Sequence, residues 1–167
     1  AAEVTTIVTP QERNRATINF VVTEGEVAKI AQVNIVGNTT FSEKELLGEM
    51  VLTTPGWLTW YTKNDQYSKQ KLAADLETLR SFYTNRGFLE FNIDSTQVSI
   101  TPDKEEIYIT INLTEGPKYT VADIRMGGEL LLPEAELVGL VRLKKGDVFS
   151  RERLTESAKL IGDRLGV

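Results

Sequence analysis

Residues 21–38 read VVTEGEVAKIAQVNIVGN, and residues 113–128 read LTEGPKYTVADIRMGG. Each stretch runs from an apolar segment through Thr-Glu-Gly into a second segment in which apolar and polar residues alternate. Alternation predicts strands with one buried face, and the glycine permits the unusual φ angles of a linker between them. Because Gly116 follows Gly25 by 91 positions, we infer that one structural unit is repeated along the chain.

A β-hairpin is predicted before each Thr-Glu-Gly joint. Residues 107–113 alternate strictly between apolar and polar side chains, and residues 16–22 repeat this pattern. Each segment follows another extended segment and a turn that contains proline, at residues 10–14 and 102–105. Turns of this length and composition are typical of hairpins whose loops exceed two residues.

Beyond each joint we predict a third short strand, over residues 31–36 and 122–126, because apolar side chains recur there at every second position. A short helix follows in each copy. In the first copy it begins at Ser42, which opens a Ser-x-x-Glu capping box. In the second copy Pro133 replaces the capping serine, and proline is tolerated in a first helical turn.

A second helix is predicted from Ser68 to about residue 85, with leucines along one face, and a counterpart begins at Ser150. The repeating unit is therefore strand, helix, helix, strand, strand. We divide the chain into the closing hairpin of one unit, a complete unit and the strand-helix-helix half of a third: residues 1–24, 25–115 and 116–167.

The composition is that of a globular protein without a nucleic-acid or membrane-spanning signature. Of 167 residues 41% are apolar and 26% charged, and the net charge is −5. The basic residues are dispersed, so a phosphate-backbone binder is not expected. Apolar runs reach only a few residues, far below the ~20 that cross a bilayer, so we expect no membrane span.

Enzymatic chemistry is disfavoured by the absence of histidine and cysteine, the commonest general base and the commonest thiolate nucleophile. Two carboxylate pairs, Glu43 with Glu45 and Glu105 with Glu106, could be considered for acid–base work. A capping box explains Glu45 and a hairpin turn explains the second pair, so solvated surface is the better interpretation. We expect a non-enzymatic chain with no catalytic residue, no metal site and no cofactor.

Four motifs carry a family resemblance. They are VNIVGN at 33–38, KQKLAADLETLR at 69–80, NRG at 85–87 and FNIDSTQVS at 91–99. These segments resemble the POTRA (polypeptide-transport-associated) domains of the BamA family of outer-membrane β-barrel assembly factors. The resemblance spans the chain as the hairpin of the second POTRA domain, the whole third domain and the first three elements of the fourth.

The resemblance implies an α+β fold of tandem β-α-α-β-β units, each a three-stranded mixed sheet covered on one face by two antiparallel helices. It also implies a scaffold on the periplasmic side of the outer membrane of Gram-negative bacteria. The implied partners are unfolded outer-membrane proteins and accessory lipoproteins such as the β-propeller protein BamB. The alternative is a POTRA module of a related secretion or import barrel.

The candidate partner-binding site lies on the strand predicted over residues 91–101, which the family fold places at a sheet edge. Its apolar residues change phase between Ile93 and Val98, so we expect a β-bulge within residues 94–97. The site comprises Asp94, Ser95, Thr96, Gln97, Val98 and Ser99. The strand pattern alone favours an ordinary edge, whereas the resemblance favours one that binds an added strand by β-augmentation.

Within this site, no structural role explains Asp94, so we expect its carboxylate to face an arginine or lysine of a partner. Trp57, Trp60 and Tyr61 are a second candidate. Such aromatics either anchor a partner or pack against the ends of the helices, and packing is favoured for at least one tryptophan.

The two incomplete units lead to an expectation about self-association. A lone hairpin is marginal in water, and a strand beneath two helices leaves apolar surface uncovered. Together, residues 1–24 and 116–167 supply all elements of one unit. We therefore expect the hairpin of one chain to complete the half-unit of another, head to tail.

Overall fold

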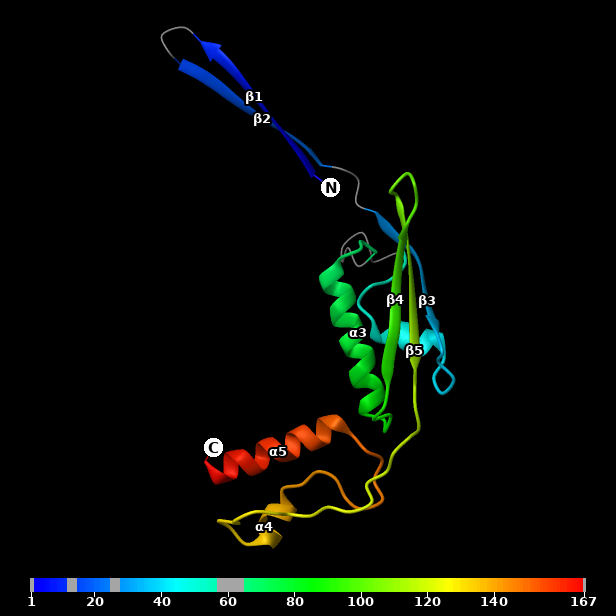
Figure 1. Ribbon diagram of the computed structural model, residues 1–167, viewed down its shortest axis with the longest axis vertical. Helices are drawn as coiled ribbons and strands as arrows, with labels where there is room; N and C mark the ends of the chain where they lie inside the picture. Colours follow the sequence, from blue (N-terminus) through cyan, green and yellow to red (C-terminus); the bar gives the residue numbers. More distant parts are fainter. Residues whose placement is uncertain (1, 12–14, 25–27, 57–64, 167) are drawn as a thin grey trace.

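The computed structural model describes residues 2–11, 15–24, 28–56 and 65–166 (Figure 1). Its strands and helices follow the predicted order, except that the strand predicted over residues 122–126 does not form. The elements are β1 (Ala2–Gln11), β2 (Arg15–Glu24), β3 (Lys29–Val36), α1 (Glu43–Glu49), α3 (Lys69–Thr84), β4 (Asn92–Ile100), β5 (Glu106–Thr114), α4 (Glu134–Gly139) and α5 (Arg151–Leu165). We call residues 28–115 the middle unit and residues 117–166 the C-terminal half-unit.

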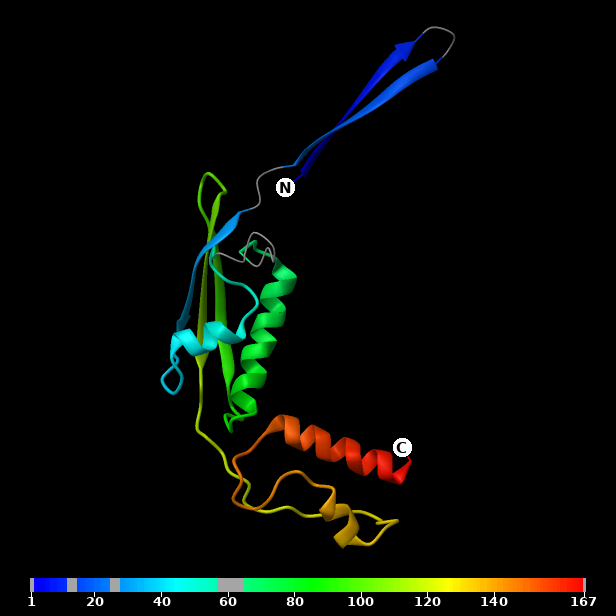
Figure 2. The same cartoon turned by 180° about the vertical axis from the view of Figure 1, so that it is seen from behind.

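The middle unit is built on a three-stranded sheet in the order β3-β5-β4. The central strand β5 runs parallel to β3 and antiparallel to β4. The helices α1 and α3 pack on the apolar face of this sheet, and α3 lies along much of its length (Figure 2). The predicted α+β fold, with a mixed sheet under two helices, is confirmed.

Local sequence explains where the helices begin. The Ser42 hydroxyl accepts a hydrogen bond from the Glu45 amide at 3.3 Å, and the Glu45 carboxylate accepts one from the Ser42 amide at 2.8 Å. This reciprocal pair is the predicted capping box, and it satisfies two donors that the first helical turn leaves unpaired. Ser68 and Ser150 cap α3 and α5 by one bond each, because their side-chain oxygens accept from the amides of Lys71 and Arg153.

The hydrophobic core fills the space between the sheet and its two helices. Its centre is Tyr83 on α3, which is fully buried and stacks on Phe91 with ring centroids 4.3 Å apart. All four inward-facing residues of β5 are at most 4% exposed: Ile107, Ile109, Ile111 and Leu113. Each is worth roughly 1.5–3 kcal/mol of transfer free energy, so β5 is the strand that the core most depends on.

A buried carboxylate closes the middle unit at the end of β5. The Glu115 side chain accepts hydrogen bonds from the hydroxyls of Thr39 at 2.6 Å, Thr40 at 2.8 Å and Tyr83 at 2.9 Å. The amides of Thr39 and Thr40 donate to the same carboxylate at 3.0 and 3.1 Å. We call these four residues the Glu115 network. The interpretation of Thr-Glu-Gly as a simple linker is therefore wrong for the second joint, because Glu115 belongs to the folded unit.

The Glu115 network determines the charge state of its carboxyl group. Burial opposes ionisation, but hydrogen bonds from Thr39 and Thr40 outweigh burial and lower the pKa of Glu115 to about 2. Burial and the hydrogen bond to Glu115 raise the pKa of Tyr83 well above its usual value. The tyrosine therefore remains a donor and the glutamate remains an anion at neutral pH.

The C-terminal half-unit contains its two helices but not its predicted strand. Residues 122–126 are extended without strand pairing, and the only bridge nearby joins Thr120 to Val148. In the middle unit the equivalent strand β3 pairs with β5. The expected strand is absent because no segment of the described chain lies beside it as β5 lies beside β3.

The half-unit contacts the middle unit at the base of α3. The Tyr119 amide donates to the Gly87 carbonyl at 2.8 Å, and the Glu152 amide in the first turn of α5 donates to the Asn85 side chain at 2.8 Å. At Gly87, where φ is +99°, a Cβ would lie 2.9 Å from the Val148 side chain. Only glycine fits this junction without strain.

The N-terminal hairpin pairs β1 with β2 from Ala2 opposite Glu24 to Gln11 opposite Arg15. The strands are longer than the sequence pattern predicted, since Pro10 and Gln11 belong to β1. Figure 1 shows the hairpin projecting from one end of the middle unit, with the C-terminal half-unit at the other end. The first joint, at Gly25, lies outside the described residues.

We predict that Glu115→Gln lowers the free energy of unfolding by roughly 2 kcal/mol at pH 7, because hydrogen bonds to a charged acceptor are stronger than neutral ones. The folded pKa lies below the unfolded value of 4.5. The stabilisation is therefore complete above about pH 4.5 and is lost as the pH falls toward 2. Urea unfolding at pH 7 and pH 3 measures both effects.

The variant should lose less stability than the wild type between these two pH values. Glu105→Gln is the matched control, because that side chain is exposed in the turn before β5 and surface changes usually stay within about 0.5 kcal/mol. Equal stabilities of Glu115→Gln and the wild type at pH 7 would show that the network contributes nothing.

Candidate functional site

The candidate site is the outer edge of β4, which pairs with β5 on one side only. Ile93 lies opposite Leu113 and Ser95 opposite Asn112, so Asp94 is an extra residue in the ladder. The predicted bulge is confirmed. Because of this extra residue, Val98 and Ile100 lie on the same face of the sheet as Ile93. The bulge therefore accounts for the change of phase in the sequence.

The hydrogen-bond pattern shows which amides of β4 face the open edge. Thr101 donates its amide to the Glu106 carbonyl at 3.0 Å, which makes these residues a hydrogen-bonded pair at the end of the ladder. Amides alternate in direction along an antiparallel strand. The amides of Thr96, Val98 and Ile100 therefore point away from β5, in a row along the edge.

The other edge of the sheet is bonded near both ends of β3. On β3 the Ile30 amide donates to the Asp65 carbonyl at 2.7 Å, and the Ile35 amide donates to the Glu43 carboxylate at 2.9 Å. Within the described part of the chain, no loop or side chain bonds to the outward amides of β4. Among the described residues, the β4 edge therefore keeps a row of three outward amides, whereas the β3 edge has two of its amides already bonded.

The two faces beside this edge differ in polarity. Val98 and Ile100 lie on the helix-bearing side but are 40% and 54% exposed, because the helices do not cover that end of the strand. On the opposite face Ser95 accepts a hydrogen bond from the Asn112 amide group at 2.9 Å, and Gln97 and Ser99 are exposed. An added strand would meet apolar groups on one side and polar groups on the other.

Asp94 has a structural role that its sequence position did not indicate. Its carboxylate accepts hydrogen bonds from the Thr114 hydroxyl at 2.7 Å and the Asn92 amide group at 2.8 Å. These bonds, that from Thr114 first, lower the pKa of Asp94. The carboxylate ties the bulge to the end of β5, so the expectation that Asp94 lacks a structural role is wrong.

The structure brings all six predicted site residues onto one strand and adds Ile100, which the sequence analysis did not include. Its outward amide and exposed side chain continue the row begun by Thr96. The alternation of apolar residues after the bulge was the signal that could have identified it. Trp57, Trp60 and Tyr61 lie outside the described residues.

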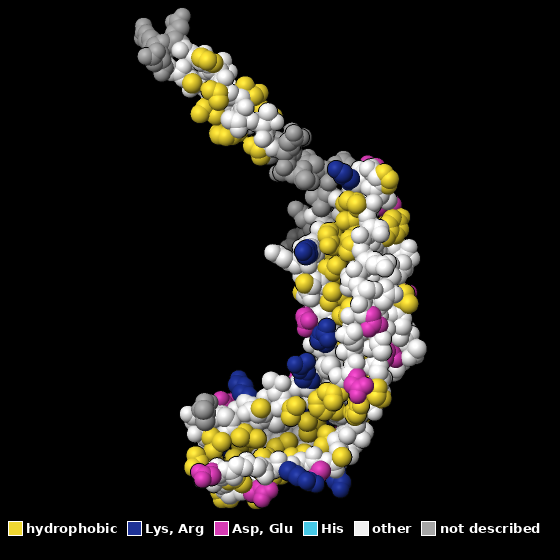
Figure 3. Space-filling view, in the orientation of Figure 1, with side chains coloured by type: hydrophobic (Ala, Val, Ile, Leu, Met, Phe, Trp, Pro, Cys, Tyr) yellow, Lys and Arg dark blue, Asp and Glu magenta, His cyan; other side chains and the backbone are white. Residues whose placement is uncertain are grey.

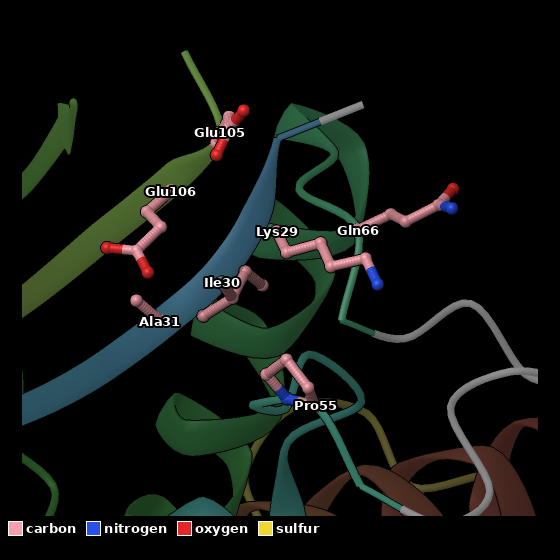
Figure 4. Close-up of a pocket in the computed structure, with 7 residues that line it drawn as sticks. All are labelled: Lys29, Ile30, Ala31, Pro55, Gln66, Glu105 and Glu106. Carbon is pink, nitrogen blue, oxygen red and sulfur yellow. The ribbon is translucent and has the colours of Figure 1, made fainter. Parts of the chain in front are cut away.

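An open depression lies near the start of β3 (Figure 4). Lys29 and Gln66 lie on one side of β3, and the carboxylates of Glu105 and Glu106 lie on the other. Lys29 pairs with Asp65 at 3.8 Å. The charged groups do not converge on one point, as general acid–base catalysis would require.

The described residues offer neither a metal site nor a membrane-spanning helix. They hold no group of three or more carboxylate or other side chains placed to bind a metal ion. Their helices also include none with the length and apolar character needed to span a bilayer. The open edge of β4 therefore remains the candidate site.

The segments that match a known protein family coincide with the repeat seen in the sequence. The sequence profile of the POTRA family, described as a surface antigen variable number repeat, matches residues 28–116 and 119–166. The chain belongs to the POTRA family. The predicted resemblance to POTRA domains is thereby confirmed.

Curated relatives include the outer membrane protein assembly factor BamA of Neisseria meningitidis serogroup B, which is 33% identical over 165 residues. BamA of Buchnera aphidicola is 28% identical over 144 residues. The alignments cover 98% and 86% of this chain but 21% and 23% of those relatives. This POTRA chain therefore spans about a fifth of their length.

A solved structure extends the comparison to the fold. The crystal structure of POTRA domains 3–5 of Haemophilus influenzae BamA superimposes with a TM-score of 0.71 at 27% identity. The match covers 84% of this chain and 55% of that one. The β-α-α-β-β architecture described above is thus shared with BamA POTRA domains.

We predict that proline at two neighbouring positions of β4 has opposite effects. Thr96→Pro removes an outward amide and should change the melting temperature little. Gln97→Pro removes an amide that bonds to β5 and should destabilise the fold by roughly 3 kcal/mol. Thermal unfolding followed by circular dichroism measures both. A greater loss of stability in Thr96→Pro than in Gln97→Pro would show that the Thr96 amide, and not the Gln97 amide, bonds to β5.

Proposed function

We propose that this POTRA chain is part of a non-enzymatic periplasmic scaffold for assembly of β-barrel proteins into the outer membrane. Its relatives are named outer membrane protein assembly factors. In this proposal the edge of β4 binds an extended segment of a client or accessory protein as a fourth strand. The observation that carries the proposal is the row of outward amides at Thr96, Val98 and Ile100 on β4.

The β4 edge is suited to bind strands of many different sequences. Main-chain hydrogen bonds supply affinity without reading side chains, so the binding is broadly tolerant. The exposed Val98 and Ile100 favour apolar residues at alternate positions of the added strand. The polar face around Ser95 and Gln97 favours hydrophilic residues at the positions between.

This alternation is the pattern of transmembrane β-strands, in which lipid-facing apolar and lumen-facing polar residues alternate. Unfolded outer-membrane proteins are therefore the client class that the edge fits. An accessory lipoprotein such as BamB would use the same row of amides if it offers an extended strand. In that case the exposed Asp94 would add a site for a basic side chain of the partner.

Binding of a strand to this edge is tested with a synthetic peptide that copies an alternating strand of an outer-membrane barrel. We predict that Thr96→Pro weakens binding at least about tenfold, a loss of about 1.4 kcal/mol, while the fold is retained. NMR titration of the labelled chain measures affinity and should show shifts concentrated on β4.

Gln97→Ala is the matched control, because it removes a side chain next to Thr96 and keeps every backbone amide; it should bind as the wild type does. A second control is the same peptide with alternate amides N-methylated, which removes its own edge donors and should abolish binding. Unchanged affinity in both Thr96→Pro and the methylated peptide would refute binding through strand addition.

A further inference from the structure

Glu43, the first residue of α1, is bonded to the edge of β3. Its carboxylate accepts a hydrogen bond from the Ile35 amide at 2.9 Å. The capping box of this helix uses Ser42 and Glu45, so helix capping does not require Glu43. Figure 2 shows α1, in cyan, beside the end of β3, where an exposed side chain of the helix can reach the strand. Glu43 therefore joins the helix to the sheet edge that the candidate site does not use.

The amide that Glu43 binds faces away from the sheet. The Ile30 amide also faces outward, since it donates to the Asp65 carbonyl at 2.7 Å. A register shift directly after Ile30 makes residue 31 an extra residue in the ladder. Because amides alternate in direction along a strand, the outward amides beyond this shift are those of Val33 and Ile35.

Contacts at the two ends of β3 leave little of its edge for an added strand. The segment before α3 covers the start of β3, through the bridge between Lys29 and Gln66. Glu43 covers the end of the strand at Ile35, and only Val33 lies between. A single outward residue cannot support the run of main-chain hydrogen bonds on which strand addition depends. Without Glu43, the outward groups of Val33 and Ile35 would form such a run.

Surface charge gives no alternative basis for choosing one edge. In Figure 3 the acidic and basic side chains on the visible face of the middle unit are scattered and are not gathered by sign. Strand addition also depends on main-chain groups, which are the same in every strand. The choice of edge therefore depends on which outward amides are free.

The repeat keeps this glutamate where it does not keep the helix cap. Glu134 follows Glu43 by 91 positions and is likewise the first residue of its helix. At the same offset Pro133 replaces Ser42 and makes no side-chain cap. The recurrence of the glutamate without the cap favours a role beyond capping. A carboxylate also interacts favourably with the dipole at a helix N-terminus, so a test must separate its charge from its reach.

We propose that Glu43 is a specificity-determining residue, whose bond to the Ile35 amide confines strand addition to the β4 edge. The carboxylate occupies the donor that an added strand would need, and a charged acceptor holds this donor more strongly than a carbonyl does. A sheet with one open edge binds one strand, whereas a sheet open at both edges can join partners into a larger sheet. This inference rests on the proposed function for the role of β4, while the closure of β3 has its own geometry.

The bond is tested first by native-state hydrogen exchange of the full chain. Glu43→Ala should accelerate exchange of the Ile35 amide at least about tenfold, because this amide loses a charged acceptor. Exchange at Ile109 on the central strand should stay unchanged if the fold is retained. Glu49→Ala removes an exposed carboxylate at the other end of α1 and is the matched control. Unchanged exchange at Ile35 in Glu43→Ala would overturn the proposal.

The choice of edge is tested with the alternating barrel-strand peptide. Intermolecular nuclear Overhauser effects between the unlabelled peptide and the labelled chain identify the amides in direct contact with it. In the wild type and in Glu49→Ala these contacts should be confined to β4, with one peptide bound per chain. Glu43→Ala should add contacts at Val33 and Ile35 and bind a second peptide. The added contacts should persist when Thr96→Pro is combined with Glu43→Ala.

Two conservative variants separate the charge of Glu43 from its bond. Glu43→Asp keeps the charge at the helix N-terminus, but its side chain is one methylene shorter and should not hold the Ile35 amide. Glu43→Gln keeps the length and an acceptor oxygen without the charge. The aspartate variant should therefore bind peptide at β3, and the glutamine variant should bind there several-fold more weakly. The reverse order would assign closure to charge and refute the role of the bond.

The outcomes for the inference and for the proposed function are distinguishable. Contacts confined to β4 in Glu43→Ala would overturn the inference and leave the proposed function intact. Contacts at β3 in Glu43→Ala, with none at β4 in the wild type, would overturn the proposed function and support closure of β3 by Glu43. A peptide that contacts neither edge in any variant would refute both.

Discussion

The hydrogen bonds to the Glu115 carboxylate are the constraint on which the middle unit depends. They join the end of the central strand β5 to the loop after β3, through Thr39 and Thr40, and to α3, through Tyr83. The loop reaches this position because Gly37, at φ +98°, passes against the Leu113 carbonyl; a Cβ there would lie 2.0 Å from that oxygen. Without this acceptor the fully buried Tyr83 hydroxyl would lose its hydrogen-bond partner.

This constraint explains why the open edge of the sheet is the edge of β4. With β5 fixed at the centre of the sheet, one neighbouring strand is covered by Asp65 and Glu43 while the other retains its outward amides. The bulge at Asp94, held by Thr114, aligns the apolar side chains after it with those before it. A sheet stabilised from one face and one edge can present the opposite edge to a partner without losing its core.

The Glu115 network lies at the boundary between the middle unit and the C-terminal half-unit. The second Thr-Glu-Gly joint, which the sequence indicated as a linker, contains Glu115 and belongs to the middle unit. The C-terminal half-unit that follows it contacts Gly87 and Asn85. The middle unit and the C-terminal half-unit therefore share a boundary that includes a backbone hydrogen bond and a bond from a backbone amide to the Asn85 side chain. The helical scaffold recurs in the C-terminal half-unit, where Leu154 is exposed and its counterpart Leu72 in the middle unit is buried.

The sequence by itself determined the hairpins, the helix starts and the bulge, because alternation and capping depend on residues only a few positions apart. It also located the candidate site on one strand. It could not show that Glu115 bonds Thr39, 76 positions away, or that Thr114 satisfies Asp94. Only the tertiary structure decided which sheet edge is open and that residues 122–126 form no strand, because strand pairing depends on which distant segment lies alongside.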